Sequence, residues 1–161
     1  VMDPAGNVVW YTQREGGLMH LDRDDRGMFK DVVLFNGNEV TNPLNQEIVS
    51  FRGLEDGEYV VNIVHYIANG GAPLPVSVKV EKLNPTVKVV FYQTLSLSGS
   101  GDERTAVRFT LKGDEVINVN NVPISLVQLT RSGSKGRGTT GGSSESPGFI
   151  DATTGSTVSR P

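Results

Sequence analysis

The residues best suited to chemistry lie in one short acidic stretch, LMHLDRDDRG, at positions 18–27. Asp22, Asp24 and Gly27 partly match the beginning of a calcium-binding loop, in which carboxylate oxygens alternate along the chain before a glycine. Calcium accepts six to eight oxygen ligands in flexible geometry, carbonyl oxygens included. Asp22 and Asp24 are therefore candidate ligands of a weak calcium site.

The same stretch departs from the EF-hand pattern. Arg26 stands where an oxygen ligand is needed, and Val33 stands where the loop would end in a bidentate glutamate. Adjacent carboxylates also repel one another unless a cation lies between them. A second interpretation therefore stays open, in which Arg23 and Arg26 neutralise the acids of a solvated turn. In both interpretations the stretch is a loop between strands, with Leu18 and Leu21 anchoring it to the core.

The two histidines offer little more. His20 precedes Asp22 by two residues and could join it in a transition-metal site. His65 shares a strand face with Tyr59 and Ile63, and no second ligand is evident beside it. A half-buried structural histidine is the favoured interpretation for His65.

Covalent catalysis has no visible basis in the sequence. The chain has no cysteine and no G-x-S-x-G nucleophile motif. Ser98, Ser100 and Ser132 lie in glycine-rich segments with no histidine nearby in sequence. We therefore expect a non-catalytic protein without an organic cofactor.

Composition is that of one ordinary globular domain. The chain has 161 residues, of which 37% are hydrophobic and 20% charged, with a net charge of −3. This acidic balance argues against a nucleic-acid partner. The first residue is Val1, in mid-pattern, so we expect an N-terminal strand, and any signal peptide or membrane anchor, to lie upstream.

Hydrophobic residues alternate with polar ones in short runs separated by turn-forming residues. This pattern predicts an all-β fold, an antiparallel β-sandwich of jelly-roll or immunoglobulin-like type with about eight strands over residues 1–130, and no helix. The expected strands are 7–13, 31–36, 46–51, 58–67, 75–82, 86–98, 105–112 and 115–119.

The C-terminal segment, residues 131–161, has a different composition, with 19 Gly, Ser or Thr among 31 residues. Such a segment buries too little apolar surface to offset the entropy of ordering it. We expect a flexible tail, and a weak basic arm is the alternative.

The pattern of aromatic residues predicts structural roles for most of them. Gly57 and Tyr59 stand at the start of the strongest strand, as in the tyrosine corner of β-sandwiches, where the hydroxyl bonds to upstream backbone. Trp10, Tyr11 and Tyr66 could form an exposed platform, but packing in the core or against its edge is the favoured interpretation.

Three motifs in order, VMDPAGNVVWY, LDRDDRG and GLEDGEYVVNIVHY, resemble secreted bacterial β-sandwich domains. The resemblance is to an uncharacterised family with D-P-x-G, L-D-x-D and G-x-Y motifs, including alphaproteobacterial proteins with an N-terminal membrane anchor. Pre-peptidase C-terminal domains are more distantly similar. The likeness covers residues 1–66 well and extends to about residue 129 in the nearest members.

The resemblance implies a non-catalytic binding or structural module of the cell envelope, periplasmic or extracellular, with a protein or glycan partner. Some such domains bind calcium, which would add Asp3 to Asp22 and Asp24. Adhesion on a virion or surface fibre is the alternative function, and a hydrolytic enzyme is a third.

Overall fold

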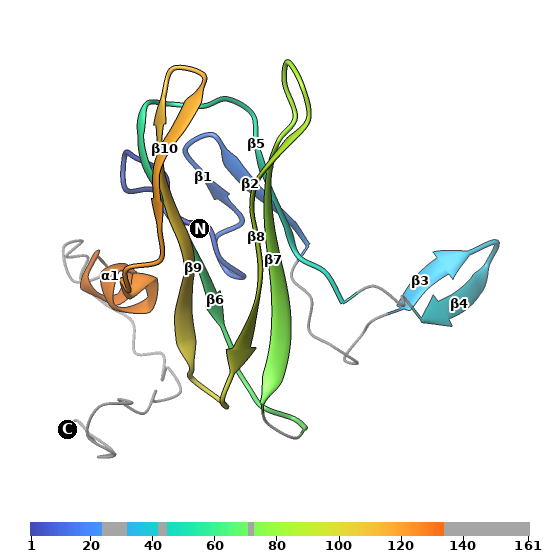
Figure 1. Cartoon of the computed structure of the whole chain (residues 1–161). Coiled ribbons are helices and arrows are strands. Elements are labelled where there is room, and N and C mark those ends of the chain that lie inside the picture. Colours follow the sequence, from blue (N-terminus) through green and yellow to red (C-terminus); the bar gives the residue numbers. More distant parts are fainter. Residues whose placement is uncertain (24–31, 42–44, 71–72, 134–161) are drawn as a thin grey trace, which may run out of the picture. The chain divides into compact units, whose positions relative to one another are not determined.

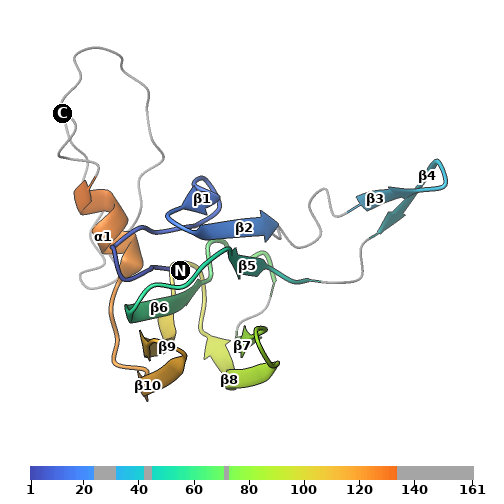
Figure 2. The same ribbon diagram turned by 90° about the horizontal axis from the view of Figure 1, so that it is seen from above.

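The computed structural model describes residues 1–23, 32–41, 45–70 and 73–133. These residues form ten strands and one helix (Figures 1 and 2). The elements are β1 (Glu15–Gly16), β2 (Met19–Arg23), β3 (Val32–Phe35), β4 (Asn38–Thr41), β5 (Ile48–Phe51), β6 (Gly57–Val64), β7 (Leu74–Lys82), β8 (Lys88–Leu97), β9 (Glu103–Lys112), β10 (Glu115–Asn120) and α1 (Leu126–Gly133).

Four sheets contain the strands, in the orders β1-β2-β5, β10-β9-β6, β3-β4 and β7-β8. The sheets are antiparallel, which confirms the predicted all-β, sandwich-like fold class. Hairpins join neighbours such as β3 and β4, or β7 and β8, because antiparallel strands need only a short turn between them.

The described residues divide into two compact units, those within residues 1–59 and 110–117 and those from residue 60 to 109 and from residue 118 onward. Each unit has its own buried apolar residues. In the first these are Val9, Met19, Leu21, Tyr59 and Leu111, and in the second they are Val60, Val78, Leu97, Ala106, Val107, Phe109 and Leu126.

Side-chain alternation accounts for the strand β7. Val78 is buried and Val76 and Val80 are half-buried, whereas Ser77 and Lys79 are exposed. Successive side chains of a strand point to opposite faces, so one face of β7 is apolar and the other meets water. The alternation of apolar and polar residues predicted for this strand is confirmed.

Residues 7–13 do not form the expected strand. Backbone bridges pair Met2 with Val8 and Trp10 with Gln13, and Trp10 and Gln13 exchange two hydrogen bonds of 3.0 Å. The chain therefore reverses directly after Trp10, and this β-rich sequence is used in two tight turns.

Helix α1 contradicts the prediction that the chain has no helix. Its N-terminal amides are satisfied by side chains: Ser125 Oγ accepts from the Gln128 amide (3.1 Å), and Glu103 Oε1 accepts from the amides of Leu126 (2.8 Å) and Val127 (3.2 Å). Unpaired N–H groups at a helix start attract such acceptors. The helix includes the first three residues of the expected tail, and residues 134–161 lie outside the described residues.

Glu103 also ties this helix to the sheet. Its Oε1 accepts from Asn62 Nδ2 (2.7 Å) on β6, and its Oε2 accepts from Ser125 Oγ (2.5 Å). Asn62 Nδ2 donates in addition to the Ile124 carbonyl (2.7 Å). One carboxylate on β9 thus fixes the segment that leads into α1.

Tyr59 makes the contact expected of a tyrosine corner. Its side chain is 2% exposed, and its hydroxyl donates to the Glu55 carbonyl (3.0 Å) and accepts from the Glu55 amide (2.9 Å). Burial raises the pKa of Tyr59 above its ordinary value; the backbone hydrogen bond with Glu55 lowers it in part, and the nearby charges of Glu55, Asp3 and Asp56 raise it further. The neutral hydroxyl is therefore the form that the fold requires.

Gly57 is needed for the same corner. Its φ is +135°, and a Cβ on it would lie 2.6 Å from the Cβ of Pro4. Both the backbone conformation and the lack of space exclude a side chain here.

Replacing Tyr59 by Phe removes the hydroxyl and leaves two backbone groups of Glu55 without this partner. We expect a loss of about 1 kcal/mol or somewhat more in the free energy of unfolding, measured by urea denaturation. Tyr92, which is 64% exposed, is the matched control, and Tyr92→Phe should change stability by less than about 0.5 kcal/mol. Equal effects at both positions would contradict the structural role of Tyr59.

Replacing Glu103 by Gln removes the negative charge at the start of α1 and turns one acceptor oxygen into a donor. We expect a loss of about 2 kcal/mol, because hydrogen bonds to a charged acceptor exceed neutral ones in strength. Glu115→Gln on the exposed end of β10 is the control and should be nearly neutral. Urea denaturation monitored by circular dichroism distinguishes the two, and a neutral Glu103→Gln variant would contradict the capping role.

Candidate functional site

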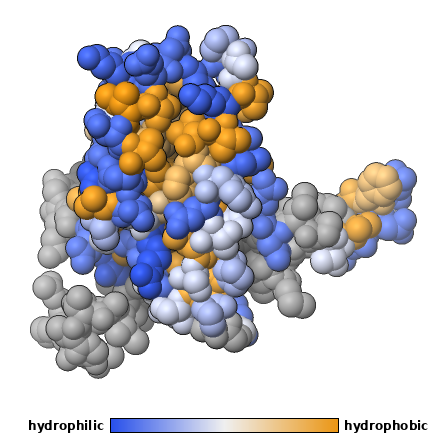
Figure 3. Space-filling model, in the orientation of Figure 1, coloured by the Kyte–Doolittle hydropathy of each residue, from blue (hydrophilic) through white to orange (hydrophobic). Residues whose placement is uncertain are grey.

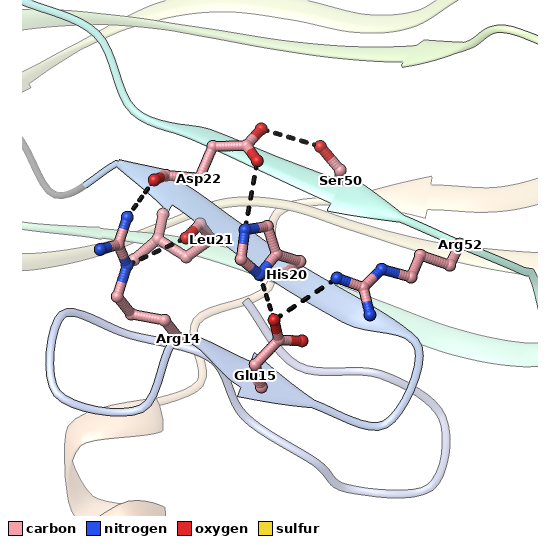
Figure 4. Close-up of polar contacts among 7 residues, drawn as sticks. All are labelled: Arg14, Glu15, His20, Leu21, Asp22, Ser50 and Arg52. Atoms are coloured by element: carbon pink, nitrogen blue, oxygen red, sulfur yellow. Dashed lines mark hydrogen bonds and ion pairs between the residues drawn. The ribbon is translucent and has the colours of Figure 1, made fainter.

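A group of polar side chains lies on one face of the sheet β1-β2-β5 (Figure 4). We call it the His20 cluster, and its members are Arg14, Glu15, His20, Asp22, Ser50 and Arg52. The register explains its assembly, because Glu15 of β1 pairs with His20 of β2, and His20 pairs with Ser50 of β5. Directly paired residues project from the same face of a sheet, so three strands contribute to one row.

In the acidic stretch, the described residues Met19–Arg23 form strand β2, where the sequence predicted a loop. Met19 and Leu21 are 1% and 3% exposed, and His20 and Asp22 point away from them toward solvent. Leu18, expected to anchor the stretch in the core, is 42% exposed. Met19, and not Leu18, is therefore the residue that joins Leu21 in the core. In a strand every second side chain is buried, so residues 19 and 21 share the inward face.

His20 lies between two carboxylates. Its Nδ1 contacts Glu15 Oε1, and its Nε2 is 3.3 Å from Asp22 Oδ1. Only the protonated imidazole can donate at both nitrogens. Arg52 extends the row, with its Nη2 at 3.5 Å from Glu15 Oε1.

Asp22 has its own set of protein partners. Its Oδ2 accepts from the Ser50 hydroxyl (3.0 Å), and its backbone carbonyl accepts from the guanidinium of Arg14. Arg14 Nε donates in turn to the Leu21 carbonyl (3.1 Å). The sequence placed His20 beside Asp22 but missed Ser50 and Arg14 as partners, because these two residues come from other parts of the chain.

The other residues of the predicted calcium site are not gathered here in the described part of the chain. Asp24 and Arg26 lie outside the described residues, as does the side chain of Arg23. Asp3 is 5% exposed and belongs to a separate loop, where its Oδ1 accepts from the Asn7 amide and its Oδ2 from Asn7 Nδ2, both at 2.8 Å. Among residues that the structure describes, no three acidic or histidine side chains are arranged to hold a metal ion.

Gly17 is packed against this Asp3 loop. A Cβ at Gly17 would lie 2.3 Å from Asp3 Oδ2 and 2.7 Å from Asn7 Nδ2. Its φ of +56° also favours glycine. Asp3 therefore stabilises the turn between residues 3 and 7, and Gly17 lies directly against this turn.

His65 and the candidate serines have structural surroundings. His65 is half-buried, its amide donates to the Asp102 carbonyl (2.9 Å), and its own carbonyl accepts from the Gly101 amide (2.7 Å). Ser98 Oγ and the Ser98 amide both donate to Asp102 Oδ2, at 2.9 and 2.8 Å. Burial acts to raise the pKa of Asp102, but these bonds and Arg104 outweigh it and lower the pKa.

Ser100 also has a structural hydrogen bond, and the aromatic residues considered for an exposed platform lie at or near the surface. Ser100 Oγ accepts from the Ala68 amide (2.6 Å), and the side chain of Ser132 is outside the described part. Tyr11 and Tyr66 are each 46% exposed, so neither fills a core position. Trp10 is half-buried.

Fold and cluster together define an all-β domain with a solvent-facing histidine–carboxylate row. Comparison with family models, with curated proteins and with solved structures gave no match. The likeness to secreted bacterial sandwich domains thus stays a prediction from the motifs.

No helix among the described residues has the length and apolar character needed to span a bilayer.

The contact between His20 and Asp22 can be measured by a double-mutant cycle with His20→Gln, Asp22→Asn and the double variant. The side chains are 31% and 47% exposed. We expect a coupling free energy of about 0.2–1 kcal/mol at low salt that decreases in about 1 M NaCl, because solvent screens exposed charge pairs. A coupling unaffected by salt would mean that the contact is not ionic.

Proposed function

We propose that the chain is a non-catalytic binding module of the bacterial cell envelope, and that its partner is a protein bound at the β3–β4 hairpin. The hairpin comprises residues 32–41, with Asn36 and Gly37 at its turn. Both have positive φ, 51° and 80°, as a tight two-residue hairpin turn requires. The envelope setting rests on the resemblance of the motifs, and the binding role rests on this hairpin.

The observation that carries the binding role is the exposure of apolar side chains on both strands. Leu34 is 76% exposed and Phe35 is 65% exposed, and Val32 and Val40 are about half exposed, at 49% and 45%. Figure 3 shows hydrophobic residues on the surface of the hairpin. Exposed apolar groups of this size, close together, are typical of interaction sites.

The backbone of the hairpin supports the same function. Among the described residues β3 and β4 pair only with each other. A two-stranded hairpin is only marginally stable alone, and an edge strand with few charges readily pairs with a further strand. Strand addition by an extended segment of a partner would pair the free backbone groups and cover Leu34 and Phe35.

A binding experiment tests this function without lipid bilayers. Envelope proteins extracted in detergent are immobilised on beads, and retention of the purified chain is compared with that of the variant Leu34→Ser/Phe35→Ser. We expect retention to fall at least about tenfold in the variant, as for loss of a buried apolar anchor. Val119→Ser, at a 49% exposed position on β10, is the control and should bind like the native chain. Equal retention of all three proteins, or none, would contradict the proposal.

Calcium binding by Asp22 and Asp24 remains a separate prediction. With a dissociation constant of about 1 mM, about 10 mM calcium would stabilise the fold by about 1.4 kcal/mol and raise Tm by about 3–6 °C. Thermal denaturation of the native chain and of Asp22→Asn, each with calcium and with magnesium, measures this. An unchanged Tm, or an equal rise in the variant, would show that Asp22 binds no calcium.

A further inference from the structure

We propose that the tip of the β7–β8 hairpin, residues 82–88, docks on the surface of an anionic lipid bilayer. The tip has the sequence KLNPTVK and joins the two strands at the yellow-green end of the hairpin in Figure 1. This surface is distinct from the β3–β4 hairpin, and the proposal does not depend on the protein partner proposed above.

Aliphatic side chains at the tip lie in water. Leu83 is 63% exposed and Val87 is 66% exposed, and Val89, next to the tip on β8, is 52% exposed. These side chains cannot form hydrogen bonds, so the favourable surroundings for them are apolar. The boundary between headgroups and acyl chains of a bilayer offers such surroundings to a small group of side chains.

The charges at the tip indicate a bilayer with anionic headgroups. Lys82 and Lys88 are direct cross-strand partners in the register, and residues 82–88 contain no acidic residue, whereas the whole chain has a net charge of −3. Two lysines at one end of the hairpin favour an anionic surface, because each lysine close to anionic headgroups adds to the attraction. Lys79 Nζ, farther along β7, lies 3.2 Å from Glu81 Oε2, so the lysines at the tip itself are Lys82 and Lys88.

The small size of the tip favours a lipid surface over a folded acidic protein. A specific protein interface buries about 1,200–2,000 Å² with complementary shape, which two aliphatic and two basic side chains do not provide. A fluid bilayer needs no fixed complementary shape and combines apolar insertion with attraction of lysines. At the tip, Lys82 and Lys88 flank Leu83 and Val87, so basic and aliphatic side chains are both available for binding to a bilayer surface.

Vesicle binding tests the proposal directly. The purified chain is sedimented with vesicles of phosphatidylcholine alone or with about 30% phosphatidylglycerol. We expect binding to the anionic vesicles, at least about tenfold weaker to the neutral ones, and weakened by about 0.5 M NaCl. Lys82→Gln/Lys88→Gln should lower affinity about 25-fold, since each lysine near an anionic surface contributes about fivefold.

A second variant tests the contribution of the aliphatic side chains at the tip, and a third variant is the matched control. Leu83→Ser/Val87→Ser should also lose binding at least about tenfold, while Leu34→Ser/Phe35→Ser on the other hairpin should bind vesicles like the native chain. All three pairs are exposed or near the surface, and Tm measurements establish that each variant is folded. Equal vesicle binding by the tip variants and the control would overturn the proposal.

The absence of cysteine from the chain allows a readout that does not remove the tip residues. Thr86→Cys places an environment-sensitive fluorescent label at the tip, and Asn38→Cys places it on β4 as the control. Anionic vesicles should shift the emission of the tip label to the blue and leave the control unchanged. No shift at Thr86, or a shift produced equally by soluble polyglutamate, would overturn docking on lipid.

Discussion

The structure depends on hydrogen bonds to backbone N–H and C=O groups in the turns, where no neighbouring strand can pair with them. Side-chain oxygens form several of these hydrogen bonds. The carboxylate of Glu103 accepts from two amides at the start of α1, and the hydroxyl of Tyr59 pairs with both backbone groups of Glu55. Asp3 does the same for the Asn7 amide. Unpaired polar groups in partly buried turns would cost more than most single contacts contribute, so these few residues determine where the chain can turn.

The features that the sequence predicts well depend on neighbours in the chain. The valine face of β7 follows from alternation, and the Tyr59 contact joins residues four apart. The strands from β5 to β10 were therefore expected close to where they occur, apart from their ends. Each of these patterns is complete within about ten residues, and local sequence suffices to identify it.

The features that the sequence does not predict depend on distant residues. Helix α1 has only 8 residues, and the carboxylate that caps it is 23 residues upstream of Leu126. The surroundings of Asp22 likewise come from Arg14 and from Ser50, which is 28 residues away. Asp22, which the sequence placed in a metal loop, instead lies on the solvent-facing side of β2, because pairing with β1 and β5 sets the direction of each side chain.

The contact between the Asp3 loop and Gly17 has a consequence for recognising relatives of this chain. Any side chain at Gly17 would collide with the Asp3–Asn7 pair, and loss of either partner would leave the other buried or half-buried group unpaired. A residue other than glycine at position 17 would therefore require a change at Asp3 or Asn7 as well. We expect chains that share this turn to keep the three residues at the same spacing, even where their exposed positions differ.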